Sequence, residues 1–278
     1  MSPRPADRRF PLAYTVCTPD CRVSDPLGYD APLEQALAEL AKHHYDGVEL
    51  QVRDPAELDA AWLRGVVEAS GMGVSALATG HVRSEDGLSL SNADPSVRSA
   101  AVDRLRAVID LAAELGTMVT AGGVTGGPDR GDADVRRAAH EALDVVARHA
   151  ADVGVRLVVE PQNRFANPGF TTTAEVRALI ETAGWTSVGI VADTFHMALE
   201  ERSIVGGILR AGPWLTHVQL GDTTRGALGT GTLDLTSVLD TLAAVGYEGW
   251  LAMEHAQTGG SPAAALRSRW AADAHAPA

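Results

Sequence analysis

In the second half of this 278-residue chain, four residues of types that bind metal ions lie within or directly after short apolar segments. Glu160 follows RLVV, Asp193 follows VGIVA, His217 lies in THVQL and Glu254 follows WLAM, at separations of 33, 24 and 37 residues. A buried carboxylate at the end of an apolar strand is unfavourable unless a cation compensates its charge, and no Lys or Arg of these segments does so. Three carboxylates and one imidazole predict a site for one divalent cation, with Mn²⁺ favoured and Mg²⁺ or Co²⁺ as alternatives.

The elements that must position these residues follow from the hydrophobic pattern. Short runs rich in Val, Ile and Leu alternate with longer amphipathic segments, which is typical of parallel strands connected by helices. The predicted strands are residues 12–17, 47–51, 74–78, 118–122, 156–160, 188–192, 215–220 and 250–254. The predicted helices are residues 33–44, 55–70, 95–115, 132–153, 173–183, 204–211, 235–245 and 263–272. Several are followed by a glycine that could end the helix in a left-handed conformation, namely Gly71, Gly116, Gly154, Gly184 and Gly246.

Eight such units of about 35 residues predict an α/β fold, a single (β/α)8 TIM barrel. The domain spans residues 1–278, with 1–10 as an N-terminal extension and 273–278 as a frayed tail. A doubly wound sheet is the alternative, but it would want a GxGxxG turn after an early strand, and none is present. In a barrel all strands end on one face, so the four metal-binding side chains are expected to converge at its mouth.

Composition excludes several classes of partner. A net charge of −13, from 23 Lys and Arg against 36 Asp and Glu, disfavours nucleic acid and anionic membranes. No apolar stretch approaches eighteen residues, and the N-terminal MSPRPADRRF has no apolar targeting region, so we expect a cytoplasmic protein with a small-molecule partner and leave a homo-oligomer open. Cys17 and Cys21 do not form a CxxC motif and are too few for a zinc cage, so two reduced thiols are expected.

Four segments carry a resemblance to a known family. The segments EPQNRF, ADTFHM, THVQLGDTTRGALGTG and GYEGWLAMEH resemble the xylose isomerase-like TIM-barrel superfamily of sugar isomerases and epimerases, in particular its ketose 3-epimerase and hydroxypyruvate isomerase branches. The resemblance is strong from about residue 155 to residue 255 and concerns only the architecture before that. It implies a sugar-like substrate and one divalent metal held by Glu160, Asp193, His217 and Glu254.

The resemblance also implies roles in catalysis. Glu160 and Glu254 match the acid/base pair of the family, and His196 and Arg225 match residues that contact substrate oxygens. One position departs from the ketose 3-epimerase pattern, because Ala166 and Asn167 stand where a glutamate usually follows NRF.

Two further residues are predicted to face the same mouth. Glu49 ends the segment GVEL and His81 follows the third strand, and we treat both as substrate-binding candidates, with a structural hydrogen bond as the alternative role for each. The glycine-rich loop of Gly122, Gly123, Gly126 and Gly127 lacks the Lys-Ser/Thr of a phosphate-binding loop and would allow flexibility or a close approach to substrate.

The predicted chemistry is proton transfer at a carbon next to a carbonyl group. A metal chelated by the carbonyl and hydroxyl oxygens would stabilise an enediolate, which an epimerase or an isomerase of a ketose, an inosose or a hydroxy-keto acid can use. A lyase acting on a keto-sugar, by dehydration or by deglycosylation of a C-glycoside, is the alternative enzyme. An abasic-site endonuclease would need more histidines and a basic rim, and a binding barrel without activity would not need all four ligands.

Overall fold

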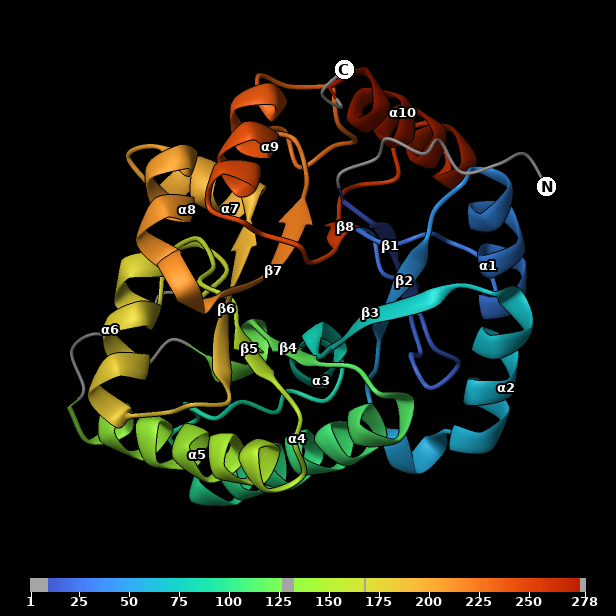
Figure 1. The fold of residues 1–278 in the computed structure, drawn as a ribbon. Coiled ribbons are helices and arrows are strands. Elements are labelled where there is room, and N and C mark those ends of the chain that lie inside the picture. The colour runs from blue at the N-terminus through green and yellow to red at the C-terminus, as the bar shows by residue number, and fades with distance from the viewer. Residues whose placement is uncertain (1–9, 127–132, 168, 276–278) are drawn as a thin grey trace.

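The strands close into a barrel. The computed structural model describes residues 10–126, 133–167 and 169–275. Each strand pairs in parallel with the next, and β8 pairs with β1, which confirms the predicted (β/α)8 TIM barrel (Figure 1). The strands are β1 (Leu12–Cys17), β2 (Gly47–Gln51), β3 (Gly73–Ala78), β4 (Val119–Ala121), β5 (Leu157–Val159), β6 (Val188–Asp193), β7 (Leu215–Leu220) and β8 (Leu251–Met253).

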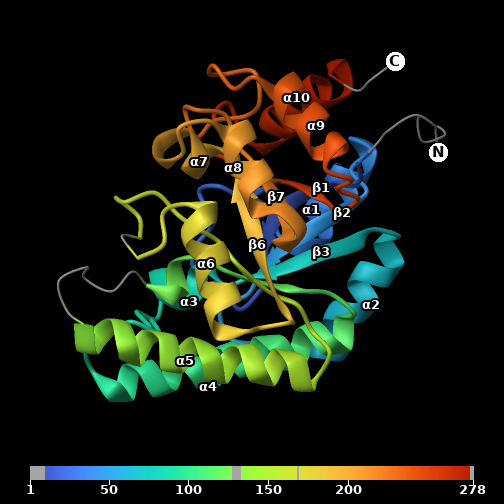
Figure 2. The same ribbon diagram turned by 60° about the vertical axis from the view of Figure 1, so that its left-hand side comes forward.

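Helices form a layer outside the strands (Figures 1 and 2). The α-helices are α1 (Leu33–Lys42), α2 (Ala60–Ser70), α3 (Gly80–Ser84), α4 (Pro95–Leu115), α5 (Ala133–Asp152), α6 (Thr173–Ala183), α7 (Thr194–Glu200), α8 (Ile204–Ala211), α9 (Leu235–Ala244) and α10 (Ser261–Ala274). Short 3₁₀ turns lie at Pro55–Glu57, Gly123–Thr125 and Gly212–Trp214. The longest helices, α4 and α5, lie side by side along one flank of the barrel (Figure 2).

The predicted helix over residues 55–70 is wrong at its start. Pro55–Glu57 form a separate 3₁₀ turn, and α2 begins at Ala60 because the Asp59 side chain accepts a hydrogen bond from the Trp62 amide. At the other end of the chain, α10 continues to Ala274 and so includes the first two residues of the expected tail. The five glycines predicted to follow helices all have positive φ, between 66° and 75°.

Residues 1–9, Gly127 and the last three residues of the expected tail lie outside the described part of the chain. The short helices α3 and α7 were not among the predicted elements; α7 follows β6 directly, and one residue separates α3 from β3. In the described ranges, no helix combines the length and the apolar character needed to cross a bilayer.

One tryptophan fills the amino-terminal end of the barrel next to β2 and β3. Gly47 and Gly73 begin these strands and lie so close to the Trp250 ring that a Cβ at either position would overlap it. This contact supports a packing role for Trp250 and leaves the opposite, carboxyl end of the barrel to the polar side chains described next.

Candidate active site at the carboxyl end of the barrel

Three carboxylates lie at the ends of β5, β6 and β8. Asp193 is the last residue of β6, while Glu160 and Glu254 directly follow β5 and β8. Their exposed fractions are 1%, 6% and 8%, so all three are buried. Arg225 connects two of them: its Nη1 donates to Asp193 Oδ2 at 3.0 Å, and its Nη2 donates to Glu254 Oε2 at 3.2 Å. One guanidinium therefore faces carboxylates from two strands.

Only one of the two carboxylate oxygens of Glu160 makes a hydrogen bond. Gln162 Nε2 donates to Glu160 Oε2 at 2.9 Å, whereas Glu160 Oε1 is buried and makes no hydrogen bond. A Cβ at Gly122 would overlap this carboxylate. The backbone of the glycine-rich loop therefore lies against the Glu160 carboxylate, and only glycine fits at position 122, directly after β4.

His196 presents a defined nitrogen to the same carboxylates. Its Nδ1 accepts hydrogen bonds from the backbone amide of Asn163 at 3.1 Å and from the Asn163 side chain at 2.7 Å. Burial lowers the pKa of His196 to about 4, so the ring is neutral near pH 7. A neutral ring that accepts at Nδ1 carries its proton on Nε2, which lies 3.4 Å from Glu160 Oε1 and 3.9 Å from Asp193 Oδ2. His196 can therefore donate a hydrogen bond at this site.

His217 and Glu49 form a fully buried pair. His217 Nε2 lies 2.6 Å from Glu49 Oε2, and Gln219 Nε2 donates to Glu49 Oε1 at 2.8 Å. The other ring nitrogen of His217, Nδ1, is buried without a hydrogen-bond partner. A histidine whose one nitrogen is held by a carboxylate while the other is free is the usual arrangement of a metal-binding histidine. For Glu49, this geometry favours the structural hydrogen bond over the substrate contact.

A tight loop after β7 positions Arg225. Arg225 has φ of 60°, a left-handed conformation that is strained for a residue with a side chain. Its amide donates to the carbonyl of Asp222 at 2.8 Å, and its own carbonyl accepts from Ala256 at 2.7 Å. The Asp222 carboxylate in turn accepts from several amides of the loop, including those of Gly229 and Leu233. The loop thus holds the guanidinium over the carboxylates, where it also stacks on Phe195 at 4.5 Å.

The three buried carboxylates have pKa values shifted in different directions. It raises the pKa of Glu160 to about 8, helped by the negative charge of Asp193. Burial also raises the pKa of Glu254 well above its ordinary value, against the effect of Arg225. At Asp193, burial is outweighed by Arg225 and His196, which hold the pKa below its ordinary value. Glu160 can carry a proton near neutral pH, and Glu254, whose pKa is also raised, lies with it beside an aspartate whose pKa is lowered, which suits acid/base chemistry.

These shifts predict how stability changes with pH. Glu160 in the folded, metal-free protein keeps its proton from its ordinary pKa near 4.5 up to about 8, whereas in the unfolded chain it loses the proton near 4.5. Stability therefore falls as the pH rises through this window, by at most about 1.4 kcal/mol per pH unit for one group. We expect urea unfolding of metal-free protein between pH 5 and 8 to show this fall and the E160Q variant to show a smaller one. Equal slopes for both proteins would contradict the raised pKa.

The buried carboxylates and imidazoles at this end of the barrel include donor atoms for a divalent cation. Glu160, Asp193 and His196 each offer an atom within 4.8 Å of the others. In addition, Glu160 Oε1 and His217 Nδ1 are buried polar atoms without hydrogen-bond partners. Free carboxylate oxygens and an imidazole nitrogen are suitable ligands for Mn²⁺ or Mg²⁺. Of the four predicted ligands, this group therefore contains Glu160 and Asp193, and it does not include His217 or Glu254. The two carboxylates suit such an ion.

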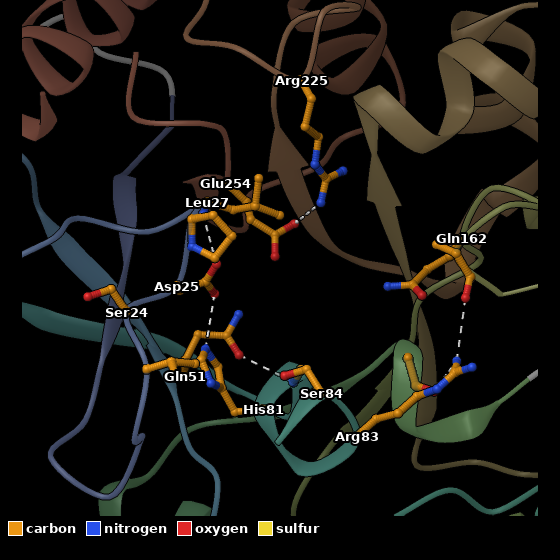
Figure 3. A pocket seen from close by; sticks show the side chains of 15 residues that line it. Ser24, Asp25, Leu27, Gln51, His81, Arg83, Ser84, Gln162, Arg225 and Glu254 are labelled. Atoms are coloured by element: carbon orange, nitrogen blue, oxygen red, sulfur yellow. Dashed lines mark hydrogen bonds and ion pairs between the residues drawn. The ribbon is translucent and has the colours of Figure 1, made fainter. Parts of the chain in front are cut away.

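A cavity of about 580 Å³ opens beside these residues and is of the size that holds small-molecule ligands. Of the predicted residues, Arg225, Glu254 and His81 line it. Figure 3 shows His81 on one side of the cavity and Gln162 on the other, with the Arg225–Glu254 pair bordering it between them. The hydrogen bonds of Gln162 and Arg225 connect the lining to the buried Glu160 and Asp193.

Three positioning residues were missed in the sequence: Gln162, Asn163 and Gln219. Two of them lie in the EPQNRF segment that carries Glu160, and Gln219 lies two residues after His217 on the same face of β7. Strand alternation could have identified Gln219, because residues i and i+2 point to one side. Ala166 and Asn167 stand where a glutamate usually follows NRF in ketose 3-epimerases. Ala166 lines the cavity, and Asn167 is buried and donates a hydrogen bond to the Thr125 hydroxyl.

Comparison with known proteins agrees with the predicted resemblance. The family model for the xylose isomerase-like TIM barrel matches residues 37–273. An L-ribulose 3-epimerase of Mesorhizobium japonicum is 33% identical over 229 residues, which cover 80% of this chain and 75% of the relative. A putative hydroxypyruvate isomerase of Streptomyces coelicolor is 29% identical and covers 93% of this chain and 94% of its own length. A solved structure of an L-ribulose 3-epimerase has a TM-score of 0.77 at 27% identity and covers 93% of this chain and 92% of its own.

Proposed function

The chain belongs to the xylose isomerase-like TIM-barrel family and is a sugar isomerase or epimerase; on this premise we propose that it is a divalent-metal-dependent epimerase of a small polyhydroxy ketone. The proposal takes the reaction class from relatives named as ketose 3-epimerases and the chemistry from this chain's own residues. Isomerisation of a hydroxy-keto acid uses the same proton abstraction and is the neighbouring reaction that the experiment below must separate.

The observation that carries the proposal is the buried set of Glu160, Asp193 and Glu254. Two of its members have raised pKa values, and the third is ionised beside Arg225. Epimerisation needs one group that takes a proton from carbon and one that returns a proton to the other face. Two glutamates from different strands, Glu160 with a pKa raised to about 8 and Glu254 with a pKa raised above its ordinary value, meet this need when one is ionised and the other is protonated.

We assign the residues the following roles. One glutamate removes the proton from the carbon next to the carbonyl, and the other delivers a proton to the resulting enediolate. His196 donates its Nε2 proton to a substrate oxygen, and Arg225 holds Asp193 and Glu254 in place while facing the cavity. Glu160, Asp193, His217 and Glu254 would hold the divalent ion, with Glu49 orienting His217. A bound divalent ion would supply positive charge that lowers the energy of a negatively charged substrate oxygen.

Proton exchange distinguishes the reactions. The protein, supplied with Mn²⁺ in heavy water, would be incubated with L-ribulose, D-psicose or hydroxypyruvate and followed by NMR. We expect deuterium at the carbon next to the carbonyl, together with the epimer of the substrate. A carbonyl that moves to the neighbouring carbon would identify an isomerase, and loss of water or of an aglycone would identify a lyase; either result would contradict the proposed epimerase.

Metal removal should stop the reaction. Dialysis against a chelator is expected to lower the rate at least about 10³-fold, because the charge stabilisation of several kcal/mol that such an ion supplies is lost. Mn²⁺ should restore the rate, and calorimetric titration of the metal-free protein should detect binding that E160Q weakens. Full activity in a preparation shown to be metal-free by elemental analysis would refute the metal-dependent mechanism.

A further inference from the structure

A second cluster of metal-binding side chains lies next to the cavity: His81 lines the cavity, and Cys17 and Cys21 line a neighbouring pocket. Cys17 is the last residue of β1, Cys21 lies in the loop that follows, and His81 is in α3. One donor atom of each lies within 4.8 Å of the others. Both cysteines are free and only partly exposed. Two cysteines alone do not make a zinc site, but here a histidine from another βα unit joins them.

Two distances at His81 match those of a tetrahedral zinc site, although Asp25 does not belong to the group whose donor atoms all lie within 4.8 Å of one another. Cys17 Sγ lies 3.6 Å from His81 Nε2, and Asp25 Oδ2 lies 3.5 Å from the same nitrogen. Tetrahedral zinc with ordinary bond lengths would separate a sulfur and a nitrogen ligand by about 3.6 Å and a nitrogen and an oxygen ligand by about 3.4 Å. The spacing of Cys17 and Cys21 is also within the range of zinc-binding cysteine pairs.

The surrounding residues already orient the candidate ligands. The other nitrogen of His81, Nδ1, lies 2.5 Å from Glu85 Oε1, so a carboxylate holds the ring with Nε2 facing Cys17 and Asp25. Asp25 Oδ1 accepts from the Leu27 amide at 2.8 Å, which leaves Oδ2 toward His81. A carboxylate behind the ligating histidine is the usual outer partner in zinc sites. The side chains of His81, Asp25 and Glu85 are 5%, 9% and 6% exposed, so this arrangement is buried.

From this geometry we propose that Cys17, Cys21 and His81 hold a structural zinc ion that fastens the loop after β1 to α3, with Asp25 of that loop moving in as the fourth ligand when zinc binds. Ser24, Asp25 and Leu27 of this loop line the cavity, as does His81 (Figure 3). A closed four-ligand site there would fix one wall of the substrate cavity without taking part in proton transfer. The site differs from the carboxylate site by its thiolates, and so it favours a softer metal than Mn²⁺.

Cobalt(II) tests the site because only thiolate ligands give a sulfur-to-cobalt charge-transfer band in the near ultraviolet. Addition of Co²⁺ to metal-free, reduced protein should produce this band, and Zn²⁺ should abolish it by displacement. The band should be absent from the C17S/C21S double variant, whose fold is checked by circular dichroism. It should persist in E160Q, so that failure of the proposed catalytic site and failure of the zinc site are distinguishable.

The positioning role of Glu85 gives a second test that does not remove a ligand. E85Q should weaken zinc binding about 10- to 100-fold in competition with a zinc chelator, whereas E114Q, which changes an exposed glutamate paired with Arg64, should leave it unchanged. The proposal is overturned if Co²⁺ gives no charge-transfer band with the reduced protein or if the band survives in C17S/C21S.

Discussion

Replacing Glu254 with Gln should lower kcat by about 10²- to 10⁴-fold and leave the fold intact, and E160Q should do the same. Glutamine has the shape of glutamate but cannot take or deliver the proton. Both side chains are buried at strand ends, and the raised pKa values of both groups show that a neutral side chain is well tolerated there. The loss is therefore expected in turnover rather than in the free energy of unfolding.

The measurement can also separate the two glutamates. In heavy water, a variant that lacks one of two acid/base groups should still exchange the carbon-bound proton of one epimer but not that of the other, and the two variants should favour opposite epimers. The matched control is E248Q, since Glu248 is exposed and precedes β8 by only a few residues. Wild-type turnover in E160Q or E254Q, with the fold confirmed, would show that the pair is assigned incorrectly.

The fold followed from the sequence because its signal is local and repeated. Each buried strand is a short run of apolar residues, and several helices end at a glycine that takes positive φ, as at Gly71 and Gly116. The break before α2 was missed since it depends on one side chain, Asp59, that satisfies the amide of Trp62 and so makes Ala60 the first helical residue. Such a cap competes with an otherwise continuous amphipathic pattern.

The site was only partly predictable because its contacts join distant segments. Strand ends identified Glu160, Asp193 and Glu254 as residues of one face, which is a property of the barrel. The hydrogen bond between His217 and Glu49 joins residues 168 positions apart, and neither sequence segment predicts this contact. The same holds for His81, whose partners Cys17 and Asp25 come from the first βα unit.

Replacing Arg225 with Met should destabilise the metal-free protein by about 3 to 5 kcal/mol, because it leaves buried carboxylates without their cation. The guanidinium side chain is 17% exposed and pairs with Asp193 and Glu254. Mn²⁺ should restore part of this stability. It should also stabilise R225M more than the wild type, because in the variant the ion replaces the positive charge that Arg225 provides to the carboxylates. R225M should also lose turnover, because Arg225 faces the cavity.

Urea unfolding with and without Mn²⁺ measures both effects, and R148M is the control. Arg148 forms an ion pair with Asp144 along α5 but is 75% exposed, so its loss should change the free energy of unfolding by less than about 1 kcal/mol.

The loss of stability caused by R225M should also become smaller as the pH falls below about 4. Arg225 holds the pKa of Asp193 below its ordinary value, so the stability that this pairing contributes is present above the ordinary value and is lost as Asp193 takes up a proton. If R225M were as stable as R148M at pH 7, or if Mn²⁺ stabilised it no more than the wild type, the three carboxylates would not form one charge-coupled cation site.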